Sequence, residues 1–208
     1  MDTLIKQIKT LLNSPVKSLV DKRIESFKKT GEGTNDDLFK ELCFCILTAN
    51  YNAEKSIMIQ EKINNSFLTD SADELADKLK KHGYRYPNTR ARYITEARKY
   101  KEQLKNIIKN ANDREKKRTW LVENIKGLGY KEASHFLRNI GLDDYAIIDY
   151  HIIDLLTKHE IIDKPKTITK KTYLEIEEKL RSISKKVNVT LAELDLYLWY
   201  IETGRILK

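Results

Sequence analysis

Residues 123–141 of this chain read Glu-Asn-Ile-Lys-Gly-Leu-Gly-Tyr-Lys-Glu-Ala-Ser-His-Phe-Leu-Arg-Asn-Ile-Gly. Apolar side chains recur at helical spacing on both sides of the two central glycines. They are Trp120, Leu121 and Ile125 before the glycines, and Ala133, Phe136, Leu137 and Ile140 after them. Two glycines around one apolar residue permit a tight turn, and the Leu128 side chain can attach that turn to the core. The pattern predicts a helix-hairpin-helix motif over about residues 114–140.

A turn of this kind can bind a phosphate. The backbone N–H groups at Gly127, at Gly129 and at the start of the second helix would point outward, where the helix dipole favours an anion. Such a contact holds DNA without reading its sequence. An ordinary pair of antiparallel helices has the same pattern, so the glycine spacing alone leaves both interpretations open.

Two charged residues near this hairpin are candidates for chemistry. Lys131 lies in the first turn of the second helix, where its positive charge opposes the helix dipole and gains nothing locally. Asp149 follows the apolar run of residues 146–148 and precedes another expected helix. An Asp at a helix start is often only an N-cap, so its position alone does not assign it a reaction.

The rest of the chain predicts an all-α protein, because seven Gly and three Pro leave few places to interrupt helices. Apolar stripes predict helices within residues 4–12, 16–24 and 39–47, and Asn13-Ser14-Pro15 separates the first two. Boxes of the Ser/Thr-x-x-Glu type predict helix starts at Ser71, Thr172 and Thr190.

Three shorter segments complete this outline. Residues 82–88 predict a loop before a helix that begins near Thr89. The basic residues 114–118 are interpreted as a solvated helix face. Residues 146–148 are too few to anchor a sheet and are expected to be extended at most.

The charge balance favours a polyanionic partner. The 208 residues include 39 Lys and Arg against 31 Asp and Glu, which gives a formal net charge of +8 and a sequence pI near 9.2. Such an excess is typical of nucleic-acid-binding proteins. A surface rich in Lys and Glu that merely solvates the protein is the alternative interpretation.

The cysteine count and the hydropathy exclude other classes of protein. Cys43 and Cys45 lie in an apolar run, so we expect buried free thiols rather than ligands. Two cysteines are too few for an iron–sulfur cluster or a four-cysteine zinc site. Because no apolar stretch approaches the roughly 20 residues that span a bilayer, and the N-terminus lacks a signal-peptide pattern, we expect a soluble intracellular protein.

Taken together, these motifs resemble the helix-hairpin-helix superfamily of DNA glycosylases. The pattern Gly127-Leu-Gly-x-Lys131, followed by a short helix and Ile148-Asp-Tyr-His151, is similar to the superfamily's hairpin and its catalytic Asp. Within the superfamily, a lysine at this position marks enzymes that both release a base and cut the strand. The four-cysteine cluster of the endonuclease III branch is missing from the sequence.

Two further segments and the chain end narrow the resemblance to the archaeal-type (type 2) 8-oxoguanine DNA glycosylase/AP lyases. Residues 47–50 resemble the end of the helix that presents a residue to the gap left by a flipped nucleotide. Residues 90–93 resemble a segment that lies near the orphaned base. A terminal lysine, here Lys208, is characteristic of this family. The resemblance covers about residues 39–208.

The resemblance implies a reaction in two steps. Loss of the base leaves positive charge on the sugar, which the Asp149 carboxylate stabilises. The amine of Lys131 attacks C1′ and forms a Schiff base, which permits β-elimination of the 3′ phosphate. One lysine then accounts for both base release and strand cleavage.

The same resemblance implies DNA contacts in other parts of the chain. The target base must leave the duplex, and Asn50, Arg90 and Arg92 are candidates for contacting its orphaned partner. A C-terminal helix residue and phosphate contacts or solvated charges are the alternative roles for these three. His151 is a candidate phosphate contact, although a His on a helix face is more often structural.

The last predicted helix suggests a base pocket. Its core stripe is Leu191, Leu194, Leu198 and Ile201, whereas Asp195 and Trp199 lie four residues apart on an adjoining face. Asp195 and Trp199 are therefore candidates for contacting the flipped base. Trp199 could stack on the flipped base, with core packing as the alternative. The resemblance implies that Lys208 helps to distinguish 8-oxoguanine from guanine, whereas its position alone predicts a disordered end.

We therefore expect a base-excision repair enzyme that acts on double-stranded DNA containing 8-oxoguanine. It would be a single glycosylase unit over residues 1–208, built as two helical subdomains with a cleft between them. We expect a monomer that needs no cofactor and carries no metal or iron–sulfur cluster, in a prokaryotic or archaeal cytoplasm and associated with the nucleoid. The alternatives are a glycosylase for another lesion, such as an oxidised pyrimidine or a mismatch, and a non-catalytic DNA-binding module.

Overall fold

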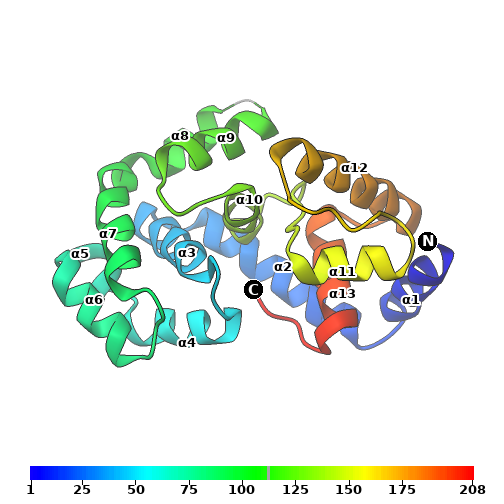
Figure 1. Cartoon of the computed structure of the whole chain (residues 1–208), viewed down its shortest axis with the longest axis horizontal. Coiled ribbons are helices and arrows are strands. Elements are labelled where there is room, and N and C mark those ends of the chain that lie inside the picture. Colours follow the sequence, from blue (N-terminus) through cyan, green and yellow to red (C-terminus); the bar gives the residue numbers. More distant parts are fainter. Residues whose placement is uncertain (112) are drawn as a thin grey trace. The chain divides into compact units, whose positions relative to one another are not determined.

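The computed structural model describes residues 1–111 and 113–208. Every regular element in these ranges is a helix, and no strand occurs among them (Figure 1). The prediction of an all-α protein is therefore confirmed. None of the described helices is both long enough and apolar enough to cross a bilayer.

The chain divides into two compact units. Unit 1 comprises Met1–Lys29 and Leu137–Lys208, and unit 2 comprises Thr30–Phe136. The two boundaries fall within the second helix and the tenth helix, so each of these helices contributes residues to both units.

Unit 1 contains the two ends of the chain. Its helices are α1 (Asp2–Leu12), most of α2 (Val16–Glu32), the end of α10 (Tyr130–Asn139), α11 (Tyr150–Lys158), α12 (Lys170–Val187) and α13 (Leu191–Thr203). The last helix packs against α1, α11 and α12. One apolar cluster joins α2 to α13 through Phe27, Leu196 and Tyr197. Because α13 is buried along most of its length, its few polar side chains must find partners inside the unit.

Unit 2 is built around α3 (Asn35–Thr48), in which every residue from Leu42 to Thr48 is buried. Its other elements are α4 (Ala53–Ile63), α5 (Ser66–Thr69), α6 (Ala72–Lys81), α7 (Pro87–Ala97), the 3-10 helix η1 (Arg98–Gln103), α8 (Leu104–Asn110), α9 (Arg114–Asn124) and the start of α10. The central helix contacts α4, α5, α7, η1 and α8. Cys43 and Cys45 are buried free thiols in it, as the sequence predicts.

The capping boxes mark two of the three predicted helix starts correctly. Ser71 and Thr190 each accept a hydrogen bond from the backbone of the Glu three residues later, and both helices begin there. The start at Thr172 is wrong, because Thr169 caps α12 and accepts from the backbone N–H of Thr172. The helix therefore begins one turn earlier than the Glu-containing box suggests.

Two other predictions need correction. The helix expected near Thr89 begins at Pro87, which suits the first turn because proline lacks the N–H that would be unpaired there. The basic residues 114–118 are not simply a solvated face, because the Arg118 side chain is fully buried. Its guanidinium lies over the Tyr130 ring at 5.5 Å and 3.4 Å from a carboxylate oxygen of Glu115.

Candidate active site

The glycine turn joins α9 to α10 as the sequence predicts. The first helix ends at Asn124, the second begins at Tyr130, and the Leu128 side chain between them is buried. Gly127 has φ +88°, a backbone conformation that residues with a Cβ rarely adopt. A Cβ at this position would also lie 2.7 Å from a ring carbon of Tyr93 and 3.0 Å from Nη1 of Arg90. Glycine is therefore required here both for the turn and for the approach of α7.

The second glycine begins α10. The carbonyl of Gly129 accepts the first helical bond from Ala133, at 3.0 Å, and its N–H donates to Oε2 of Glu132, at 3.1 Å. The Glu132 carboxylate thus already occupies one of the donors that the sequence assigns to a DNA phosphate. A phosphate that binds at this N–H has to share or displace that carboxylate.

Lys131 lies in the first turn of α10 with a side chain that is 27% exposed. Its Nζ atom is 3.6 Å from Oε1 of Glu132, whose side chain is 13% exposed. This ion pair explains how a lysine is tolerated at the positive end of a helix. The neighbouring carboxylate compensates both the charge of the ammonium and the helix dipole. The amine remains within reach of solvent and hence of a substrate.

In unit 2, α7 connects the hairpin to the end of α3. Arg90 is 8% exposed and donates from Nη2 to the carbonyl of Ala49, at 2.8 Å, while the same side chain lies against Gly127. Asn50 follows Ala49 with φ +56° and is exposed. Arg90 is therefore not a solvated charge: it fixes the turn that carries Asn50 relative to the glycine turn.

A tyrosine strengthens the same turn. The Tyr84 hydroxyl donates to the carbonyl of Leu47, at 2.6 Å, and its ring packs on Tyr51 with centroids 4.4 Å apart. The Tyr51 hydroxyl in turn donates to the carbonyl of Gly83, at 3.0 Å. Burial raises the pKa of Tyr84, so its hydroxyl stays protonated and can donate. The backbone on both sides of Asn50 is therefore fixed by side chains from the loop before α7 and from α7 itself.

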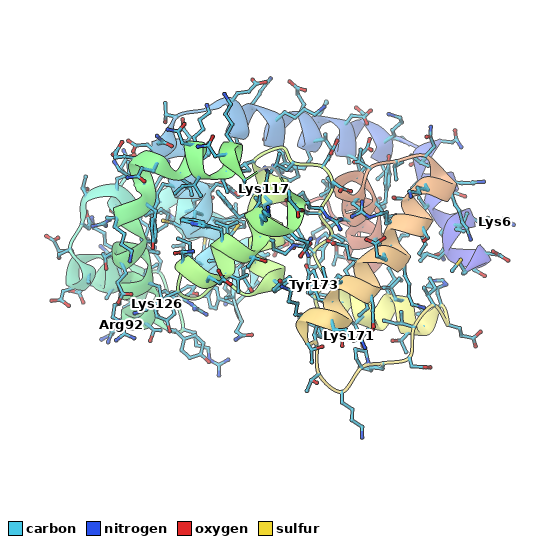
Figure 2. All side chains as sticks on the ribbon, turned by 90° about the horizontal axis from the view of Figure 1, so that it is seen from above. Lys6, Arg92, Lys117, Lys126, Lys171 and Tyr173 are labelled. Atoms are coloured by element: carbon cyan, nitrogen blue, oxygen red, sulfur yellow. The ribbon has the colours of Figure 1, made fainter. Side chains whose placement is uncertain are left out.

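Arg92, the other arginine of this segment, is exposed. Figure 2 shows Arg92 and Lys126 at the same edge of unit 2, and both pair with Glu96, at 3.9 and 2.8 Å. The hydrogen bond from Lys126 is the main cause that lowers the pKa of Glu96. Two cations around one carboxylate leave a net positive charge beside the glycine turn, which suits a phosphate contact.

In unit 1, Asp149 caps α11. Its Oδ1 accepts from the backbone N–H of Ile152, at 3.0 Å, and its side chain is half-buried. The N-cap that the sequence allowed is therefore present. Capping engages one carboxylate oxygen, so it fixes the group without excluding contact between its other oxygen and a substrate.

The segment before Asp149 is buried and belongs to no helix or sheet. Three consecutive backbone N–H groups, those of residues 146–148, donate to buried side chains instead. The acceptors, in chain order, are Glu177 at 3.2 Å, Asp195 at 3.3 Å and Tyr173 at 3.3 Å. The Tyr173 hydroxyl also donates to the carbonyl of Ala146, at 2.7 Å, and Figure 2 shows this tyrosine on α12. These contacts fix the backbone that leads into Asp149.

Asp195, predicted as a base contact, is 7% exposed and has both oxygens engaged inside the unit. Oδ1 accepts from Ile147, and Oδ2 accepts from Nη1 of the buried Arg138. Burial above all, and to a smaller extent the charge of Asp149, raises the pKa of Asp195 to about 6 against the opposing effect of Arg138. Asp149 is therefore within electrostatic reach of Asp195.

Three aromatic rings lie together beside Asp149. His151 packs on Tyr150 with centroids 3.9 Å apart and meets Trp199 edge-on at 5.1 Å. Tyr150 is 68% exposed, whereas Trp199 is half-buried and its Nε1–H is buried without an acceptor among the described residues. The structure thus brings His151 and Trp199 together and adds Tyr150, which the sequence analysis did not select.

The C-terminus is not a loose end. Gly204 ends α13 in the left-handed conformation, and the Ile206 side chain packs on the cluster that joins α2 to α13. Lys208 follows two residues later and is half-buried. The disordered end that position alone predicts is therefore wrong, because Ile206 anchors the tail.

The predicted site residues fall into two groups. Unit 2 brings together Asn50, Arg90, Arg92, Gly127, Gly129 and Lys131, and unit 1 holds Asp149, His151, Asp195, Trp199 and Lys208. Sequence reasoning missed the polar residues that support them, namely Glu132, Arg138, Tyr173 and Glu177. Glu132 offered a signal, because it lies three residues after Gly129 as in a capping box. Among the described residues, no cluster of His, Cys, Asp or Glu could hold a metal ion.

Comparison with known proteins shows the family to which the chain is related. A sequence model of the family described as 8-oxoguanine DNA glycosylase matches residues 20–189. An 8-oxoguanine DNA glycosylase/AP lyase of Methanocaldococcus jannaschii is 52% identical over 206 residues, which cover 99% of each chain. A protein of the same name from Korarchaeum cryptofilum is 49% identical and covers all of this chain and 99% of its own length.

Solved structures agree with the fold as well. The crystal structure of the Methanocaldococcus jannaschii glycosylase/lyase in complex with a 15mer DNA containing 8-oxoguanine is 51% identical and has a TM-score of 0.96. The match covers 99% of this chain and all of the other. The 8-oxoguanine DNA glycosylase of Thermotoga maritima is 44% identical with a TM-score of 0.93, covering 100% of this chain and 99% of the other. The fold and the hairpin are those of a helix-hairpin-helix DNA glycosylase, which confirms the resemblance found in the sequence.

This chain belongs to the 8-oxoguanine DNA glycosylase family.

The glycine turn allows a direct test. Gly127→Ala is expected to lower the free energy of unfolding by about 1–3 kcal/mol, because alanine is strained at φ +88° and its Cβ meets Tyr93. Gly129→Ala is the matched control, since its φ is not positive and its Cβ would only approach a flexible Glu132 oxygen, at 3.2 Å. Chemical denaturation of both variants measures the difference, and equal losses would show that the turn does not require glycine at 127.

Proposed function

We propose that this chain releases 8-oxoguanine from double-stranded DNA and cuts the strand at the resulting abasic site, with Lys131 as the nucleophile. The observation that carries the proposal is the position of Lys131, a solvent-accessible amine in the first turn after a glycine turn suited to phosphate. Full-length relatives named 8-oxoguanine DNA glycosylase/AP lyase support the activity.

The proposed reaction assigns a separate task to Asp149. As the bond between C1′ and the base nitrogen breaks, the base leaves with the bonding electrons and positive charge develops on the sugar. The Asp149 carboxylate stabilises this charge, and its cap to Ile152 holds it in place without a change of conformation. Asp149→Asn is an informative variant, since an amide oxygen can still cap the helix.

Lys131 then carries the lyase step. After the ammonium has given up a proton, the Lys131 nitrogen bonds to the cationic C1′. The bond from C1′ to the ring oxygen then breaks, and a second proton passes from the nitrogen to that oxygen, which leaves an open sugar joined to Lys131 as a protonated imine. The imine acidifies the C2′ proton, and removal of that proton expels the 3′ phosphate by β-elimination. Hydrolysis of the imine returns the amine, so the protein is unchanged after a turnover.

The remaining site residues are proposed to bind DNA and the base. Gly127, Gly129, Arg92 and His151 would contact phosphates, and Asn50 would occupy the gap left by the flipped nucleotide, held there through Arg90. Trp199 would stack on the base, and Lys208 would contact the atoms that distinguish 8-oxoguanine from guanine. We further propose a monomer without a metal or other cofactor, located in the cytoplasm with the nucleoid. Activity in the presence of a chelator checks the cofactor proposal.

Borohydride reduction tests the nucleophile. The wild-type protein is expected to become covalently attached to a duplex that contains 8-oxoguanine opposite cytosine, because borohydride reduces the imine to a stable amine. Lys131→Gln should lose this trapping and at least about 10²-fold of its strand cleavage, while binding of damaged DNA changes little. Lys126→Gln, on the other side of the two glycines, is the matched control and should still be trapped.

Other results would count against the assignment. Trapping of Lys131→Gln would place the nucleophile elsewhere, and a wild-type protein that binds the duplex without being trapped would be a DNA-binding module. Efficient trapping on an oxidised pyrimidine or a mismatch, but not on 8-oxoguanine, would indicate a glycosylase for another lesion.

Deletion of Lys208 tests the recognition of the lesion. The truncated protein should keep its stability, because Ile206 still anchors the tail, but should lose preference for 8-oxoguanine over guanine. Competition between a lesion-bearing duplex and an undamaged duplex measures this preference. Unchanged discrimination by the truncated protein would remove Lys208 from the base pocket.

A further inference from the structure

The buried charge pair of Arg138 and Asp195 lies outside the reaction described above. Arg138 is 3% exposed and lies in the last turn of α10, whereas Asp195 is 7% exposed and lies on α13. Replacing a buried ion pair of this kind by apolar residues is often neutral or stabilising, so its presence in a core calls for another reason.

The pair is held rigidly by its neighbours. Arg138 donates from Nε and Nη2 to Oδ1 of Asn139, at 3.0 and 2.8 Å, and from Nη1 to Asp195. Its guanidinium also lies over the Phe27 ring, 4.8 Å from the centroid. The second oxygen of Asp195 accepts the N–H of Ile147, two residues before Asp149. The pair therefore connects the end of α10 directly to the backbone that carries Asp149.

The charges around Asp195 explain why a carboxylate is needed at this position. Nη1 of Arg138 donates to Asp195 from α10, and Asp149, which caps α11, follows two residues after Ile147, whose N–H donates to Asp195. From α12, Glu177 and Tyr173 accept the N–H groups of Ala146 and Ile148, the residues on either side of Ile147. The buried residues of α1 are apolar. Without Asp195, the buried guanidinium would be an uncompensated positive charge in the unit whose Asp149 must stabilise a cation. A negative Asp195 cancels that charge and leaves the field of Asp149 undiminished.

We propose that Asp195, paired with Arg138, is a positioning residue for Asp149 in the base-release step, and that it does not itself contact the base. The inference rests on the proposed role of Asp149. It reassigns Asp195 from the base contact that the sequence suggests to a support for the carboxylate that acts on the sugar.

A comparison of the two half-reactions tests the proposal. Asp195→Asn keeps an oxygen for the N–H of Ile147 but removes the charge. We expect single-turnover release of 8-oxoguanine to fall by roughly 10²-fold, whereas cleavage of a preformed abasic site, which needs Lys131, changes by less than about fivefold. A purely structural defect would slow both steps together.

The pH profile supplies a second readout. Because burial raises the pKa of Asp195 to about 6, the wild-type protein loses the negative charge as the pH falls through this value. Base release by the wild-type protein should therefore decline below pH 6, and this decline should be missing from Asp195→Asn. A decline that persists unchanged in the variant would overturn the proposal.

If Asp195→Asn alone is unstable, a double variant can still test the electrostatic role of the pair. Asp195→Asn with Arg138→Met removes both charges while retaining the acceptor for Ile147, and it should recover part of the lost base release. Recovery supports the electrostatic role, whereas a double variant with base release no faster than that of the single variant contradicts it. The wild-type protein and Lys131→Gln are assayed for borohydride trapping in parallel. If the wild-type protein is trapped and Lys131→Gln is not, the proposed function holds, and a negative result with Asp195→Asn then counts against this inference alone.

Discussion

The requirement that a buried backbone N–H find an acceptor shapes unit 1 around Asp149. Residues 146–148 have neither a helix nor a sheet to pair with, and burial removes them from water. Glu177, Asp195 and Tyr173 supply the acceptors from two helices. These polar side chains would be costly to bury without partners, and the hydrogen bonds from the backbone N–H groups offset that cost. The same hydrogen bonds fix the backbone that leads into α11. The carboxylate of Asp149, which we propose to be catalytic, thus has a rigid support without a sheet.

In unit 2, a buried arginine fixes the backbone of two turns. Arg90 is long enough to contact the glycine turn at one side and to donate to Ala49 at the other. Two segments proposed to contact DNA, the turn around Asn50 and the turn at Gly127, are thereby fixed to one helix. Because the guanidinium is buried, its removal would disturb both turns together, and this explains why an arginine in a segment assigned to DNA binding faces inward.

Local patterns in the sequence predicted most of the fold, and tertiary contacts account for what they missed. The apolar stripes, the break at residues 13–15, the Leu128 anchor and the N-cap at Asp149 all depend on neighbours within a few residues. Thr172 was misread because Thr169, without a Glu three residues later, caps the helix equally well. Burial of Arg118 and the pairing of Arg138 with Asp195 join residues that are distant in the chain or on different helices, and no local pattern indicates them. For the candidate site, the hairpin was predicted and is present, the reactive roles of Lys131 and Asp149 stay predictions, and the polar residues that support them were not predicted.

In the proposed reaction a single amine, that of Lys131, forms the covalent bond to the damaged nucleotide's sugar. Peptide mapping by mass spectrometry of the borohydride-reduced complex tests it most directly, because the reduced bond marks the attacking residue permanently. We expect to find the added mass of the sugar remnant on Lys131, in the peptide that spans the glycine turn. A remnant on another lysine or on the N-terminal amine would contradict it.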